Sequence, residues 1–186
     1  MLGSEKNRQQ ELGEVLRLSP GLLQPRIELA RSQIGGGKAQ AASDLLDSAP
    51  KNQKSAAALA ATRNWALLAL NHADEAGADA ENALKTQRIP ELVLQRGIAK
   101  FLKKDFVGAR TDAQEILRTN AADSGALSLA IQACLADKQN ALALQILNES
   151  TAKNSASPRM QLVAGEWLRQ PERRPTPGLP SLRLRR

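Results

Sequence analysis

Apolar residues recur along most of the chain at intervals of three and four, and short polar stretches interrupt them. This spacing places the apolar side chains on one face of an α-helix. Polar segments such as GGGK and NHAD separate the runs and are typical of tight turns. Pro20, Pro50, Pro90 and Pro158 fall between runs or at their starts, where a missing amide hydrogen costs least. The pattern predicts helices near residues 5–18, 22–34, 39–48, 55–70, 73–87, 91–103, 106–119, 124–136, 140–151 and 158–169.

The predicted helices follow a repeat of about 34 residues. Ala42, Ala76, Ala109 and Ala143 stand at the same point of successive units, at intervals of 34, 33 and 34. A residue at the crossing point of two helices must be small if their backbones are to approach, and this explains the alanine column. Each unit is therefore predicted to be a hairpin of a first and a second helix. Two further columns keep the spacing: Ala30, Asn64, Gly97, Ile131 and Gly165 in the first helices, and Leu16, Leu84 and Leu117 in the second, with Pro50 and Thr151 as departures.

These columns resemble the tetratricopeptide repeat. The unit from Pro90 to Asp123 carries the small, small and large positions of that family at Gly97, Ala109 and Leu117. Most aromatic positions of the family pattern hold other residue types here, and Ala121 stands where the closing proline is expected. The resemblance covers residues 5–168. It implies an all-α fold, a right-handed helical-hairpin solenoid of about four units with partial units at both ends, as one domain over residues 1–168.

Both ends of this array fall in the middle of a unit. Residues 5–20 match a second helix without its partner, and residues 158–168 match a first helix without its partner. Two interpretations stay open. The chain is a piece of a longer array or changes reading frame near Arg169, or each end helix serves as a cap.

The net charge of +7 is concentrated at one end. Residues 169–186 hold six arginines and one acid, Glu172, and so account for +5, which leaves +2 for residues 1–168. A body so close to neutral offers no strong field to a phosphate backbone. Residues 169–186 are rich in arginine and proline and are expected to form a disordered tail, which would carry any binding to RNA or to a membrane surface.

No cluster of residues points to catalysis, and no cofactor or metal is expected. GGGK at residues 35–38 lacks the glycine and the hydroxyl of a phosphate-binding loop, since Ser32 and Ala39 stand at those positions, and it is interpreted as a turn. His72, the single histidine, is interpreted as a solvated turn residue. Cys134 lies in an apolar run and is expected to be a buried small hydrophobe. The carboxylates alternate with lysine and arginine, as on solvated helix faces.

The family resemblance also implies a binding surface, because the first helices of tetratricopeptide arrays line a concave groove. Carried over by register, the groove positions are Ile27, Arg31, Ile34, Ala61, Trp65, Leu68, Leu94, Ile98, Phe101, Ser128, Gln132 and Leu135. Trp65 and Phe101 are the strongest candidates because aromatic anchors dominate binding energy when desolvated. The alternative is that both aromatics belong to the core. The stripe is mostly apolar, which favours an extended or helical partner with apolar side chains.

The leading functional hypothesis is a non-catalytic scaffold that binds a segment of another protein, and not an enzyme. The alternative is a binder of anionic polymer, RNA or a membrane surface, through residues 169–186. No small-molecule substrate and no transmembrane segment are expected. The compartment is not indicated: the cytoplasm is the default, and the periplasm or envelope applies if the chain is a piece of an exported array.

Overall fold

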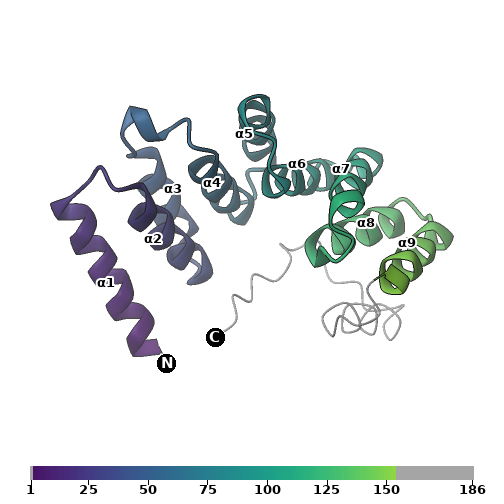
Figure 1. Cartoon of the computed structure of the whole chain (residues 1–186), viewed down its shortest axis with the longest axis horizontal. Coiled ribbons are helices and arrows are strands. Elements are labelled where there is room, and N and C mark those ends of the chain that lie inside the picture. Colours follow the sequence, from purple (N-terminus) through teal and green to yellow (C-terminus); the bar gives the residue numbers. More distant parts are fainter. Residues whose placement is uncertain (1, 154–186) are drawn as a thin grey trace. The chain divides into compact units, whose positions relative to one another are not determined.

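The structure, a computed structural model, describes residues 2–153, and all regular elements in this range are helical (Figure 1). The α-helices are α1 Leu2–Leu18, α2 Leu23–Gly35, α3 Ala39–Asp47, α4 Ala57–Ala69, α5 Ala73–Thr86, α6 Pro90–Leu102, α7 Phe106–Thr119, α8 Ser124–Ala136 and α9 Asn140–Lys153, and a short 3₁₀ helix, η1, spans Lys51–Gln53. Each helix that the periodicity predicts within this range is present, with bounds close to those expected. The helix predicted at residues 158–169 lies outside the described residues.

Within residues 2–153, α1 is followed by four hairpins, α2–α3, α4–α5, α6–α7 and α8–α9, and the two helices of each hairpin pack together. The alanine column is buried at these contacts: Ala42, Ala76, Ala109 and Ala143. In the first-helix column, a Cβ atom added to Gly97 would lie 2.8 Å from Cδ2 of Leu129 and 3.1 Å from Cβ of Asp112. The helices therefore approach closely at the alanine column and at Gly97, and the predicted all-α hairpin fold is confirmed.

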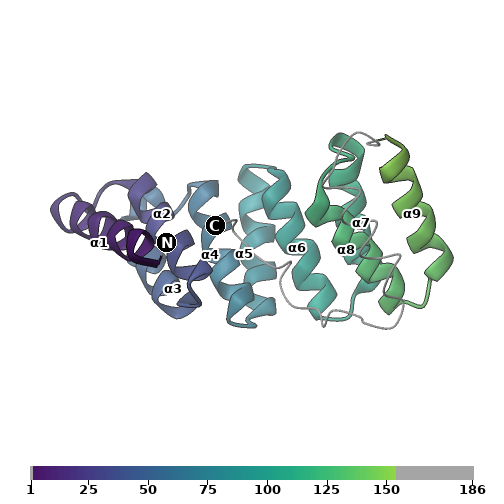
Figure 2. The same cartoon turned by 90° about the horizontal axis from the view of Figure 1, so that it is seen from below.

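The helices form two compact units. Unit 1 extends to Ile89 and contains α1–α5, and unit 2 begins at Pro90 and contains α6–α9. In unit 1, α4 packs against α2, α3 and α5, and in unit 2, α8 packs against α6, α7 and α9. Figure 2 shows α4 beside α5 and α8 beside α9. Within each unit the two first helices are therefore neighbours.

The same turn closes every hairpin. The second residue after the first helix has a positive φ in each case: Gly37 (75°), Asn71 (63°), Lys104 (66°) and Lys138 (60°). The amide of the following residue donates to a carbonyl at the end of the first helix, as from Asp105 to Lys100 at 2.9 Å. This Schellman arrangement satisfies carbonyls that a helix end leaves unpaired. The predicted polar turns thus share one conformation, which glycine adopts freely and lysine does not.

Unit 1 departs from the repeat where α3 ends. This helix stops at Asp47, because Pro50, which stands in the column of Leu16, Leu84 and Leu117, has no amide hydrogen to continue it. The chain then forms η1, and the buried Gln53 donates from Nε2 to the carbonyl oxygen of Gly21. The stretch between α3 and α4 is therefore specific to this unit and was not predicted.

Arg26 fills the end of the first hairpin. It is 4% exposed, and its guanidinium donates to the carbonyl oxygen of Leu45 at 2.8 Å, to Oγ of Ser48 at 3.1 Å and to the carbonyl oxygen of Pro20 at 2.7 Å. Leu45 and Ser48 lie at the C-terminal end of α3, where the helix dipole favours a cation. Burial lowers the pKa of Arg26. A long polar side chain therefore supplies bulk at a core position.

Lys104→Gly is expected to raise the free energy of unfolding by about 0.5–1 kcal/mol. The left-handed backbone costs an L-residue roughly 1–2 kcal/mol, and the greater freedom of glycine in the unfolded chain offsets part of the gain. Urea unfolding followed by circular dichroism measures the change. Lys85→Gly, at an exposed helical position of α5, is the control and should lower the stability. A loss of stability in Lys104→Gly would contradict the explanation.

Candidate partner-binding surface

The predicted groove positions divide between the core and the surface. Four are buried: Ile27, Ala61, Leu68 and Ile98. The others are partly or wholly exposed: Arg31, Ile34, Trp65, Leu94, Phe101, Ser128, Gln132 and Leu135. The division follows from packing: the buried members lie on α2, α4 and α6, which all pack against neighbouring helices, whereas the members on α8 are all partly exposed. The exposed members lie on the adjacent first helices α2 and α4 in unit 1, and α6 and α8 in unit 2.

In unit 2 the exposed stripe continues from α6 to α8. A Cβ atom added to Gly125 at the start of α8 would lie 3.1 Å from Cδ2 of Leu94 on α6, so Leu94 reaches the neighbouring helix. The half-buried ring of Phe101 lies 5.4 Å from the ring of Phe106, at an interplanar angle of 57°. This tilted pair holds the Phe101 ring in place. Phe106, which begins α7, was not predicted, although the short KKD turn between the two phenylalanines is a signal that they could meet.

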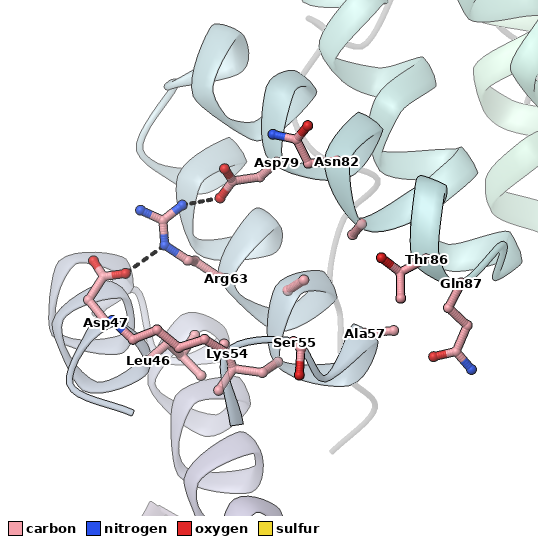
Figure 3. A pocket seen from close by; sticks show the side chains of 13 residues that line it. Leu46, Asp47, Lys54, Ser55, Ala57, Arg63, Asp79, Asn82, Thr86 and Gln87 are labelled. Carbon is pink, nitrogen blue, oxygen red and sulfur yellow. Dashed lines mark hydrogen bonds and ion pairs between the residues drawn. The ribbon is translucent and has the colours of Figure 1, made fainter. Parts of the chain in front are cut away.

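Arg63 links three helices of unit 1 through three carboxylates. Its Nε donates to Asp47 at the end of α3 at 2.6 Å, Nη2 donates to Glu75 at 2.8 Å, and Nη1 donates to Asp79. Glu75 and Asp79 both lie on α5, and Figure 3 shows Arg63 between Asp47 and Asp79. Burial lowers the pKa of Arg63, but its carboxylate partners outweigh burial and raise the pKa above its ordinary value. The charged guanidinium therefore ties α3 and α5 to α4.

In unit 2 the equivalents of Arg63 and Asp79 are Arg96 and Asp112, and a second cation joins them. Nε and Nη2 of Arg96 donate to the two carboxylate oxygens of Asp112 at 3.0 and 2.7 Å, and Nζ of Lys100 lies 3.0 Å from Asp112. The side chain of Asp112 is 3% exposed, whereas that of its counterpart Asp79 is 35% exposed. The prediction that the carboxylates lie on solvated faces is therefore wrong for Asp112, because α7 packs between α6 and α8.

Cys134 is buried, as predicted, with no exposed surface. Burial raises the pKa of its thiol, and a hydrogen bond with Arg110 of α7 opposes part of that rise. Arg110 also lies 3.6 Å from the carboxylate of Asp137 and 3.1 Å from Oε1 of Gln139. The basic neighbour comes from another helix, so spacing along α8 does not reveal it.

The remaining predicted features are turns or lie outside the described range. GGGK forms the turn expected of it, with Lys38 directly before α3. The side chain of His72 is 55% exposed in its turn, as predicted. Across residues 2–153, no group of three or more His, Cys, Asp and Glu side chains could hold a metal ion. The helices in that range also include none long and apolar enough to cross a membrane. The arginine-rich segment 169–186, with its hypothesised RNA or membrane binding, lies beyond these residues.

Comparisons with known proteins identify the fold. A scan against protein-family models finds no match, and a search of curated proteins finds none. Among solved structures, a tetratricopeptide repeat protein from Parabacteroides merdae is similar, with a TM-score of 0.68 and 16% sequence identity. The match covers 89% of this chain and 67% of that chain. At this identity the likeness shows the fold alone. The chain therefore has a tetratricopeptide-like fold, as the repeat columns predict.

Asp112→Ala is expected to lower the free energy of unfolding by about 3–5 kcal/mol, because it removes a buried carboxylate that two partly buried cations share. Asp79→Ala is the matched change in unit 1 and should cost about 1 kcal/mol or less, since Asp79 is more exposed and Arg63 keeps two other carboxylates. Urea unfolding of both variants measures the difference. Equal losses would show that burial does not distinguish the two pairs.

Cys134 is expected to react at least about tenfold more slowly with a disulfide reagent at pH 8 in the folded chain than in a peptide of the same local sequence. The raised pKa leaves less thiolate, and burial blocks access, so the rate should increase with pH. Absorbance of the released thiolate follows the reaction. A Cys134→Ala chain carrying Ala136→Cys, at an exposed position, is the control and should react like the peptide. Similar rates for both chains would contradict the assignment.

Proposed function

We propose that the chain is a non-catalytic scaffold that holds a segment of another protein against the first helices of each unit. The tetratricopeptide-like fold favours protein binding as the general class of function. The exposed members of the predicted stripe are the residues proposed to contact the partner segment.

The observation that carries the proposal is the surface that α6 and α8 form in unit 2. Phe101 is partly exposed, and its contact with Phe106 limits its motion. A rigid aromatic can bury its remaining surface against a partner at little cost in entropy. Leu94 and Leu135 add apolar surface on the same two helices, and the polar residues there supply hydrogen-bonding groups. This mixture suits an extended or helical segment with apolar side chains.

Unit 1 offers a smaller surface of the same kind. Trp65 on α4 is half-buried, and the adjacent helix α2 contributes Ile34 and the exposed Arg31. Tryptophan and arginine are both enriched among residues that dominate binding energy. Because the two units are separate compact bodies, each surface is tested by its own aromatic residue.

Peptides selected from a displayed random library on the intact chain test the proposal. Phe101→Ala or Trp65→Ala is expected to weaken a peptide that binds the corresponding unit by about tenfold or more, as for aromatic residues at the centre of an interface. Fluorescence anisotropy measures the dissociation constants. Leu144→Ala, at an exposed apolar position of α9, is the control and should leave them unchanged.

Thermal unfolding monitors whether each variant keeps its fold. If folded Trp65→Ala and Phe101→Ala chains bind every selected peptide as tightly as the parent chain, the first-helix surfaces are not the binding sites. Loss of affinity in Leu144→Ala would instead place the site on the second helices.

A further inference from the structure

The second hairpin contains a pocket of about 400 Å³, within the range of about 300–1,000 Å³ that ligand sites commonly have. Its lining comes from the end of α3, the segment that leads into α4, and the helices α4 and α5. Leu46 and Leu59 are buried and form its apolar interior. Asp47, Lys54 and Asp79 are more exposed and lie at its opening, and Figure 3 shows the two carboxylates on either side of Arg63.

The pocket coincides with two register positions that are buried in the other hairpins but partly exposed in this one, and at the first of them this hairpin also has less bulk. Four residues before the first-helix column (Ala30, Asn64, Gly97 and Ile131) stand Arg26, Ala60, Val93 and Leu127. Seven residues after the alanine column of the second helices stand Ala49, Ala83, Ile116 and Ser150. In the other hairpins both positions are buried, whereas Ala60 and Ala83 remain partly exposed and line the pocket. A side chain that the other hairpins supply themselves is therefore missing here.

Arg63 links the walls on either side of this space. Its guanidinium binds Asp47 on α3 and Asp79 on α5, so the two helices on either side of the pocket are held to α4. The short α3, which ends at Asp47, leaves the opening free. The pocket is thus already formed in the absence of an occupant.

We propose that this pocket takes an arginine or lysine side chain from a segment of another protein. The aliphatic stem of such a side chain would pack against Leu46, Leu59 and the two alanines, and its charged head would lie near Asp47 and Asp79. The first hairpin supplies the precedent, since Arg26 stands at the register position of Ala60 there and donates to the carbonyl oxygen of Leu45 near the end of α3.

The charges around the pocket leave room for one more cation. Asp47 and Asp79 line the pocket and Glu75 lies outside its lining, but all three bind Arg63; with Lys54 at the opening, the cluster beside the pocket holds three carboxylates and two cations. In unit 2 the equivalent carboxylate, Asp112, is approached by both Arg96 and Lys100. The counterpart of Lys100 in the second hairpin is Leu67, which carries no charge. A basic side chain from a partner would restore this balance.

Titration of the isotope-labelled full chain with small probes, followed by NMR, tests the proposal. N-acetyl-arginine amide is expected to shift the backbone amides of the pocket residues, with weaker shifts from N-acetyl-leucine amide and none from N-acetyl-glutamate amide. A pentapeptide centred on arginine should bind more tightly than the arginine amide, because neighbouring residues of a partner segment add contacts.

Two variants fill the pocket with residues that unit 2 already uses. Ala60→Val and Ala83→Ile are each expected to weaken binding of the arginine probes at least tenfold and to raise the midpoint of thermal unfolding. Asp79→Asn should weaken them severalfold and leave the leucine probe unaffected. Ala78→Val, at an exposed position of α5 outside the pocket, is the control and should retain binding.

Several outcomes would overturn the proposal. If the leucine and arginine probes bind equally well, the pocket does not select a basic side chain. If the pentapeptide binds no more tightly than the arginine amide, the ligand is a small molecule and not a protein segment. If the parent chain binds none of the probes and the Ala60→Val and Ala83→Ile variants are more stable than it, the space is a packing defect and not a binding site. Altered pocket resonances after replacement of Arg183, Arg185 and Arg186 by serine would identify this chain's own segment as the occupant. Trp65 and Phe101 do not line the pocket, so failure here leaves the proposed scaffold function standing.

Discussion

The close approach of the two helices in each hairpin is the constraint on which the other features depend. The alanine column is buried where the helices meet, and Gly97 shows that one added carbon would already crowd a neighbouring helix. No bulk can be added at that crossing, so the hairpin must be filled by residues on either side of it. The residues at those flanking positions therefore determine whether a hairpin is fully packed or contains a pocket.

The hairpins could be predicted from the sequence because their determinants are local. Small residues recur at one spacing, and each turn needs the same left-handed residue, so the order and bounds of the helices follow. The stretch around η1 could not be predicted in the same way. Pro50 indicates that α3 must stop, but the fold of the following residues depends on Gln53 reaching the carbonyl of Gly21, a distant partner. The division into two units lies at Ile89, where the columns show only a spacing of 33 instead of 34 residues, a change too small to reveal a boundary.

Burial of the candidate site residues could be predicted only in part. The register assigns each residue to a position on a helix, but it does not say how deeply that position is buried. Ile27 and Arg31 lie one turn apart on α2, yet the first is in the core and the second is exposed. The charged residues show the same limit. Asp79 and Asp112 occupy equivalent positions, and only the packing of neighbouring helices makes one partly exposed and the other buried. The repeat in the sequence could have revealed that Asp79 and Asp112 each pair with an arginine, but not that the two carboxylates differ in burial.

The polar lining explains how the second hairpin tolerates its missing bulk. A dry apolar cavity costs roughly 24 cal/mol per Å³ of empty volume, but an open pocket with polar walls can hold water instead. Asp79, Asn82 and Thr86 offer hydrogen-bonding groups on one wall. A side chain that displaces this water must replace its hydrogen bonds or lose affinity. A purely apolar side chain would fill the interior and make no contact with the carboxylates at the opening, whereas a long aliphatic stem with a charged end matches both parts of the pocket.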